Sequence, residues 1–61
     1  METQSWRWAV EIEQLGGRQF VRVIDDGNVR IRGFDNLPDA ERFAEGERQR
    51  MKLPSIVYRY R

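Results

Sequence analysis

The chain has 61 residues, which is enough for one small domain over 1–61, and a chain this short buries only about 60% of the surface that its unfolded form exposes. It contains no cysteine and no histidine, which excludes disulfides, thiolate metal sites, cysteine nucleophiles and the commonest general base. Eleven basic and ten acidic residues leave a net charge of +1, too small to attract nucleic acid or an anionic membrane. Any electrostatic function must come from charge gathered on one face.

The composition predicts a thin core and an unusual choice of basic residue. Hydrophobic residues make up 39% of the chain and charged residues 34%, and a core of this size seldom supplies more than about 3 to 5 kcal/mol. Docking on a partner or forming a homodimer would add stability. Every basic residue except Lys52 is arginine. Arginine suits phosphates, guanine edges and carboxylates, although a genome rich in arginine codons explains the excess equally well.

The first two predicted strands form a hairpin. Apolar residues alternate with polar ones from Trp6 onward, which is the pattern of a half-buried strand. Gly16 and Gly17 supply the two positive-φ positions of a tight turn, and this turn places Ile12 opposite Val21. The same register sets Val10 against Val23 on the apolar face, and Glu11 against Arg22 on the polar face.

The second turn, Asp25–Asn28, allows two registers. A two-residue loop would pair Val23 with Arg30 and send the apolar residues of the third strand to the polar face. A three-residue loop of Asp25, Asp26 and Gly27 pairs Val23 with Val29 and keeps the apolar residues together, so we predict the longer loop. The predicted core face of the sheet is then Trp6, Trp8, Val10, Ile12, Val21, Val23, Val29 and Ile31.

A helix and a last strand complete the expected fold. Asn36 can cap a helix, and Pro38 and Asp39 suit its first turn, so we predict a helix from about Leu37 to Met51. Its apolar stripe is narrow, and Glu47 interrupts it at helical spacing. Residues 55–61 are β-branched and aromatic, which predicts a fourth strand, parallel to strands one and three or paired with a second copy of the chain. The expected class is α+β: a three-stranded antiparallel meander packed on one α-helix, then a C-terminal strand.

The sequence gives no sign of catalysis, metal binding or membrane insertion. Asp25 and Asp26 beside a glycine are turn formers, and they lack the spaced ligands of a calcium loop. No lysine and hydroxyl residue follow Gly16 and Gly17, as a phosphate loop requires. We therefore expect no enzyme activity, no cofactor, no metal and no small-molecule substrate. No apolar run is long enough to cross a bilayer and residues 1–5 do not resemble a signal peptide, so we expect a soluble, cytoplasmic protein.

The candidate binding residues lie on the predicted outer face of the sheet, because the helix takes many acidic residues to the other side. They are Arg7, Arg18, Phe20, Arg22, Arg30 and Arg32. A three-stranded sheet can enter the major groove of DNA, where arginines grip guanine edges or phosphates and Phe20 could stack on a base. Trp6 and Trp8 could also stack on bases, but their face predicts core packing. The competing interpretation of the arginines is a solvated face on which they pair with Glu11 and Glu13.

One segment adds a family resemblance. The run from Arg32 to Phe43, Arg-Gly-Phe-Asp-Asn-Leu-Pro-Asp-Ala-Glu-Arg-Phe, resembles the junction between the last strand and the helix in the AP2-like, arm-type DNA-binding domains of tyrosine recombinases. The segment from Trp8 to Ile12 is similar to a strand of the same family. Asn36 stands where that family prefers threonine, and a strand follows the helix here. The resemblance implies that the exposed sheet face, with the six residues named above, contacts DNA.

Two functions therefore stay open. The first is a small non-enzymatic nucleic-acid-binding module that contacts DNA through the arginines of its sheet. The second is a protein-interaction module, either a homodimer or a docking domain for another protein, in which the C-terminal strand or a patch of Phe20 and Ile24 meets the other chain. The thin core motivates the second function, and the segregated charge and the resemblance motivate the first.

Overall fold

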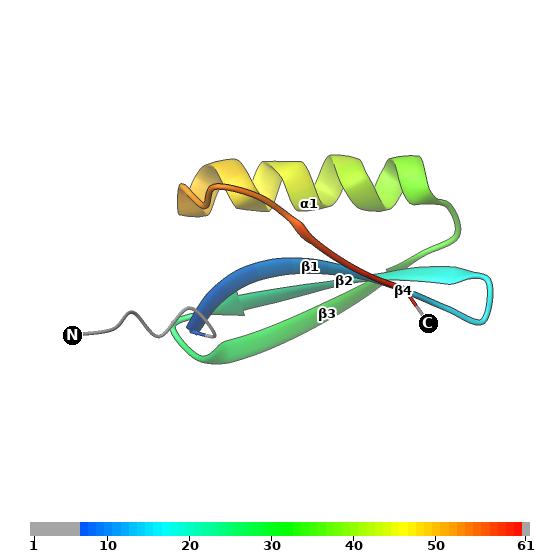
Figure 1. The fold of residues 1–61 in the computed structure, drawn as a ribbon, viewed down its shortest axis with the longest axis horizontal. Helices are drawn as coiled ribbons and strands as arrows, with labels where there is room; N and C mark the ends of the chain where they lie inside the picture. The colour runs from blue at the N-terminus through cyan, green and yellow to red at the C-terminus, as the bar shows by residue number, and fades with distance from the viewer. Residues whose placement is uncertain (1–6, 61) are drawn as a thin grey trace.

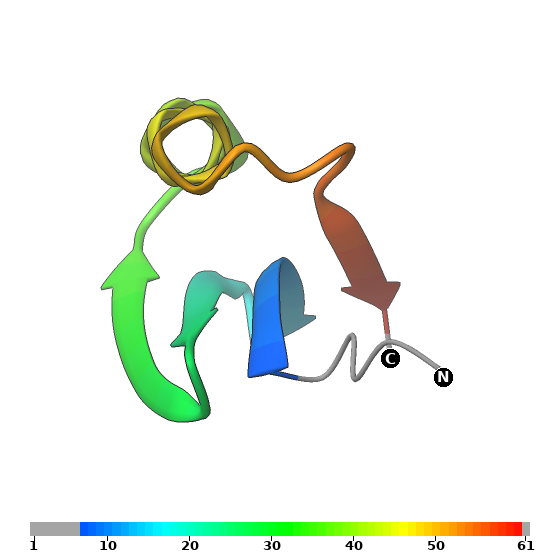
Figure 2. The same ribbon diagram turned by 90° about the vertical axis from the view of Figure 1, so that its left-hand side faces the viewer.

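The computed structural model describes residues 7–60, apart from the side chain of Tyr60. Its elements in chain order are β1 (Trp8–Leu15), β2 (Arg18–Asp25), β3 (Asn28–Phe34), α1 (Leu37–Met51) and β4 (Val57–Tyr60). The strands form one sheet in the order β3-β2-β1-β4, antiparallel except for the parallel pair of β4 with β1. The helix lies on one side of this sheet (Figures 1 and 2). The predicted fold class is confirmed.

The first hairpin has the predicted register. Ile12 pairs with Val21 and Val10 with Val23, on the side of the sheet that faces the helix. Glu11 pairs with Arg22 on the opposite side. The turn between β1 and β2 has φ values of 59° and 81° at its two glycines, a left-handed conformation that other residues adopt at a cost.

The second hairpin differs from the prediction by one residue. Asp25 pairs with Asn28 and Val23 with Arg30, so the loop has two residues instead of three. Both loop residues have positive φ, 53° at Asp26 and 85° at Gly27, as in the tight turns whose twist matches that of the strands. The prediction of a three-residue loop was therefore wrong, and every side chain of β3 lies on the opposite face from the one expected.

The position of the core explains why this register is tolerated. Within residues 7–60, the fully buried hydrophobic residues belong to β1, β2 and α1: Val10, Ile12, Val21, Val23, Ala40 and Ala44. The helix packs mainly on β1 and β2, and every residue of β3 from Asn28 to Gly33 is exposed. Since neither face of β3 is deeply buried, placing Val29 and Ile31 on the far side of the sheet costs little. The turn chemistry then decides the register.

The helix begins and ends where the sequence predicts. The side chain of Asn36 accepts a hydrogen bond from the backbone N–H of Asp39 at 2.9 Å, and Pro38 lies in the first turn. Lys52 closes the helix in the left-handed conformation, with φ of 59°. Partly buried hydrophobic residues surround the core: Phe34, Leu37, Phe43, Met51, Leu53 and Ile56.

Trp8 is more exposed than the sequence predicted. Trp8 lies on the helix side, as expected, but it pairs with Asp25 at the outer end of the hairpin and remains 43% exposed, so the prediction that it packs in the core was wrong. Trp6 is outside the described residues.

The parallel direction predicted for β4 is confirmed, and β4 joins the sheet beside β1. Tyr58 of β4 donates a hydrogen bond to Glu41 of the helix at 2.8 Å.

Candidate interaction surfaces

The six predicted binding residues do not share one face. Arg18, Phe20 and Arg22 alternate along β2 and point away from the helix. Arg30 and Arg32 pair with Val23 and Val21, so they lie on the helix side. Arg7 precedes β1. The arginines are divided between the two faces because the two-residue turn shifts the pairing of β3 with β2 by one residue relative to the prediction. The predicted outer face that joined all of these residues was therefore wrong.

Most of these arginines are paired with carboxylates. Arg7 contacts Asp26 at 2.6 Å, and Arg18 contacts Asp35 at 2.9 Å. Each of these pairs is at least 40% exposed on both side chains, so it adds little to stability. Each pair also cancels a positive charge at the surface.

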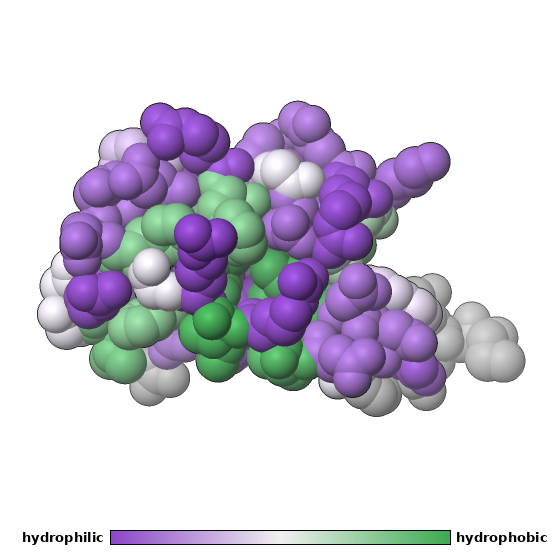
Figure 3. Space-filling model, turned by 180° about the vertical axis from the view of Figure 1, so that it is seen from behind, coloured by the Kyte–Doolittle hydropathy of each residue, from purple (hydrophilic) through white to green (hydrophobic). Residues whose placement is uncertain are grey.

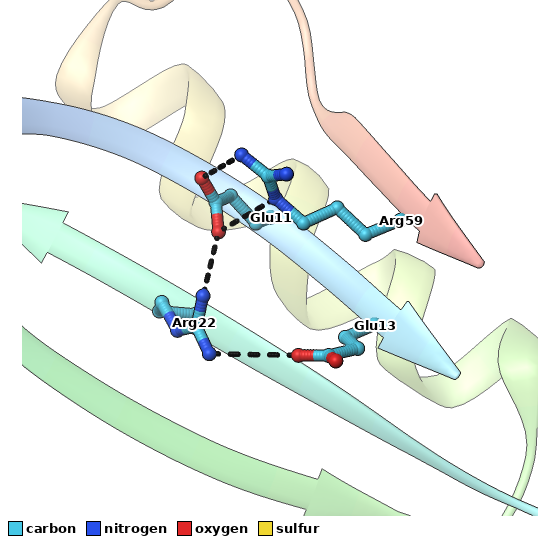
Figure 4. Close-up of polar contacts among 4 residues, drawn as sticks. All are labelled: Glu11, Glu13, Arg22 and Arg59. Carbon is cyan, nitrogen blue, oxygen red and sulfur yellow. Dashed lines mark hydrogen bonds and ion pairs between the residues drawn. The ribbon is translucent and has the colours of Figure 1, made fainter. Parts of the chain in front are cut away.

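The centre of the open face carries a compact cluster of charges. Here the open face means the side of the sheet away from α1. Glu11 accepts hydrogen bonds from Arg22 at 3.0 Å and from Arg59 at 3.3 Å, and Arg22 also reaches Glu13 at 3.5 Å (Figure 4). The side chain of Glu11 is only 10% exposed, which is tolerable because two guanidinium groups neutralise it. These four residues form the ion-pair cluster, whose net charge is zero.

Apolar side chains surround the ion-pair cluster on the open face. Val29 is 53% exposed and Ile31 60% exposed on β3, and Leu15 and Val57 are also exposed. Phe20 lies over Gly33, where an added Cβ would come within 3.2 Å of its ring. The apolar residues of the open face are Leu15, Phe20, Ile24, Val29, Ile31 and Val57. Exposed apolar side chains on neighbouring strands of a small protein are typical of an interaction site.

A second surface lies on the helix side of β3. A groove with a volume of about 290 Å³ separates β3 from α1, and it is lined by Val21, Val23, Arg30, Ile31, Arg32, Phe43 and Glu47. Figure 3, seen from the side of β3, has apolar surface below the hydrophilic outer surface of the helix, with hydrophilic side chains crossing it. We call this the β3 groove.

The two arginines of the β3 groove have different partners. Arg30 lies 3.6 Å from Glu47, which is beyond hydrogen-bond distance, and its side chain is 66% exposed. Arg32 stacks on two rings, with its guanidinium carbon 5.4 Å from the centre of Phe34 and 5.1 Å from that of Phe43. Among residues 7–60, Arg32 is the arginine for which the structure gives no carboxylate partner. Glu47, which interrupts the apolar stripe of the helix, faces Arg30 across the groove, and its closer partner is Arg50 of α1, at 2.6 Å.

Metal and membrane sites are not found in the part of the chain that the structure describes. No group of three or more histidine, cysteine, aspartate or glutamate residues within it could hold a metal ion. None of its helices has the length and hydropathy needed to cross a membrane. Hydrogen bonds from Arg48 and Gln49 lower the pKa of Glu45, in α1, to about 2.

Comparison with known proteins identifies no relative of this chain. No family model, curated protein or solved structure matches the chain. The resemblance to AP2-like domains therefore stays a prediction, and functional inference must start from the two surfaces just described.

Proposed function

We propose that this protein is a protein-interaction module that forms a homodimer through the open face of its sheet. The observation that carries this proposal is the exposure of Val29 and Ile31 beside Phe20 and Ile24, on a face whose charged residues already neutralise one another. Burying such a face removes apolar surface from water without stranding a charge. A domain with a thin core gains most from this burial.

A second copy of the chain is the partner that fits this face. The ion-pair cluster has no net charge, so the face does not repel itself across a two-fold axis. Such an axis brings the apolar halves of β2 and β3 from both copies together. Strands of eight residues and a width of four strands give an outline of roughly 25 by 20 Å. This is near the lower end of specific interfaces, so we expect a dimer that dissociates in the micromolar range.

Sedimentation equilibrium over about 1 μM to 1 mM tests the proposal. We expect a monomer–dimer equilibrium in the wild type and a monomer in Ile31→Lys, because lysine places an unpaired charge in the centre of the interface. Ser55→Lys is the matched control, since it adds the same charge to the exposed connection between α1 and β4. A wild type that stays monomeric throughout, or equal dimerisation by both variants, would contradict the proposal.

The residues predicted to bind nucleic acid do not share one surface. Arg7, Arg18 and Arg22 are paired with carboxylates, and Arg30 and Arg32 lie on the other side of the sheet. We therefore expect binding to duplex DNA no tighter than nonspecific affinities, about 10⁻⁴ to 10⁻⁶ M at physiological salt. A titration at two salt concentrations measures this. Tighter binding that is lost in both Arg22→Glu and Arg30→Glu would restore the nucleic-acid function.

A further inference from the structure

The outer edge of β3 offers backbone groups to a new strand. Within residues 7–60 no strand lies beyond β3, which forms one end of the sheet. In a hairpin with a two-residue loop, the pair that flanks the loop, here Asp25 and Asn28, exchanges backbone hydrogen bonds, and alternate pairs along the strands do the same. The backbone groups of Val29, Ile31 and Gly33 therefore point away from β2, toward the open edge.

The two faces of this edge strand select different side chains. On the open face, β3 presents Val29 and Ile31, which favour apolar neighbours. On the helix side it presents Arg30 and Arg32 at the mouth of the β3 groove. A strand added beside β3 would extend both faces, since its side chains alternate in the same way. Its best complement is a segment in which apolar and acidic residues alternate.

Arg32 is the residue of this site that most favours an acidic ligand. Its guanidinium group is held over Phe34 and Phe43 and faces no carboxylate among the described residues, so its hydrogen-bond donors are available to a ligand. Arg30 is only loosely held by Glu47, at 3.6 Å. Two arginines two residues apart on one side of a strand match two acidic side chains with the same spacing.

The same charges disfavour a second copy at this edge. If two β3 strands paired across a two-fold axis, Arg30 and Arg32 of both copies would gather on one side of the joined sheet. Like charges on neighbouring strands are destabilising, and inward-pointing charges at a sheet edge prevent self-pairing. The β3 edge therefore excludes its own copies and accepts an acidic partner.

We infer that β3 and its groove form a docking site for an extended acidic peptide, which adds to the sheet as an antiparallel strand with its acidic side chains on Arg30 and Arg32. Antiparallel addition is the more stable pairing. The apolar side chains of the peptide lie beside Val29 and Ile31. Only the charged contacts of this site are separate from the proposed dimer, because Arg30 and Arg32 lie on the side of the sheet that the dimer leaves free, whereas Val29 and Ile31 belong to both.

The first test uses labelled peptides and the full chain. The probe is a capped peptide of seven residues, the length of β3, in which glutamate and valine alternate. The control has the same composition, with glutamates and valines in separate blocks. We expect fluorescence anisotropy at about 0.15 M salt to detect binding of the alternating peptide and binding of the block peptide that is weaker by about tenfold or more. Equal binding of both peptides would overturn the inference, since charge alone would then explain it.

Backbone methylation tests the added strand without changing the protein. In antiparallel pairing, the residues opposite Val29 and Ile31 lie on the same face as they do, so the valines of the peptide exchange hydrogen bonds with β3. N-methylation of those valines should abolish binding, and N-methylation of the glutamates should leave it within about twofold. Abolition by methylated glutamates alone would indicate a parallel strand and overturn the antiparallel arrangement.

Variants of the protein test the charged side of the site. We expect Arg32→Glu to weaken binding of the alternating peptide by about tenfold or more. The matched control Arg42→Glu makes the same charge change on an exposed helix position and should change binding by less than twofold. In amide NMR spectra, Val29, Ile31 and Gly33 should gain protection from exchange on binding. Unchanged binding by Arg32→Glu, or protection elsewhere, contradicts the inference.

Discussion

The two hairpins of this sheet share β2, yet their registers have different physical origins. In the first, Val10 and Ile12 lie under the helix with Val21, and any slip by one residue would expose them. In the second, β3 is exposed on both faces, and the register follows the conformation of Asp26 and Gly27. The comparison teaches that an apolar pattern fixes register only where a second layer covers the strand. At an uncovered edge, the turn decides.

The largest expected difference between the hairpins lies in their isoleucines. Ile12 is 1% exposed and Ile31 is 60% exposed. Ile12→Ala should lower the free energy of unfolding by about 3 kcal/mol, and Ile31→Ala should change it by less than about 0.5 kcal/mol. Urea unfolding followed by circular dichroism measures both at a concentration where the protein is monomeric. If Ile12→Ala does not fold, Ile12→Val should still cost about 1 kcal/mol. Comparable losses at both positions would contradict the comparison.

Alanine in place of Gly27 of the turn and of Gly46 of the helix should change the stability of the protein in opposite directions, by a smaller amount. Gly27 has φ of 85°, whereas Gly46 lies within α1. No atom lies within 4 Å of a Cβ added at either position, so sterics with neighbours do not distinguish them. Gly27→Ala should destabilise the protein by about 1 to 2 kcal/mol, and Gly46→Ala should stabilise it by up to about 1 kcal/mol. Opposite signs in thermal unfolding would support the role of the turn, and a neutral Gly27→Ala would count against it.

The ion pair within the first hairpin and the ion pair between β3 and α1 should couple unequally. Arg22 and Glu11 are 3.0 Å apart with Glu11 mostly buried, whereas Arg30 and Glu47 are 3.6 Å apart with Arg30 exposed. Double-mutant cycles to alanine should give about 1 kcal/mol for the first pair and less than about 0.5 kcal/mol for the second. A stronger coupling in the second pair would mean that the helix holds β3 more firmly than its exposure indicates.

The smallest effect concerns the helix that covers the first hairpin. The hydrogen bond from Arg48, reinforced by one from Gln49, lowers the pKa of Glu45 from 4.5 to about 2. The stabilisation from this carboxylate is therefore complete above pH 4.5 and is lost as the pH falls toward 2. An NMR titration of the Glu45 carboxyl should have its midpoint at about pH 2 and should shift upward in Arg48→Gln. A midpoint that does not move in the variant would remove Arg48 as the cause.

The dimer and the peptide site extend the same comparison. Both use the open face of β3, and only the peptide site also uses Arg30 and Arg32 on the helix side. The other strands contribute the ion-pair cluster to the dimer. Ile31→Lys should abolish the dimer, and Arg32→Glu should leave the dimer intact while it weakens the binding of the peptide. If both variants affected both processes equally, the two faces of β3 would not act as separate surfaces.

Sequence reasoning recovered much of the fold and less of the candidate site. The glycine turn, the capping by Asn36 and the helix bounds depend on local chemistry, and they were predicted correctly. The side of the sheet taken by Arg30 and Arg32 was not, because the prediction assumed that the apolar residues of all three strands share one face. One local signal opposed that assumption: the Asp26-Gly27 pair, which suits a two-residue turn.

The amino-acid sequence by itself determined the elements, the first hairpin and the lack of cysteine and histidine chemistry, since these depend on residues close in the chain or on composition alone. Only the tertiary structure decided which edge β4 joins and that the helix leaves β3 uncovered, so that the turn could set the register of β3. Those outcomes depend on where a single helix of limited width can lie on a four-stranded sheet. The helix covers one face of β1 and β2 and leaves β3 exposed, at one end of the sheet.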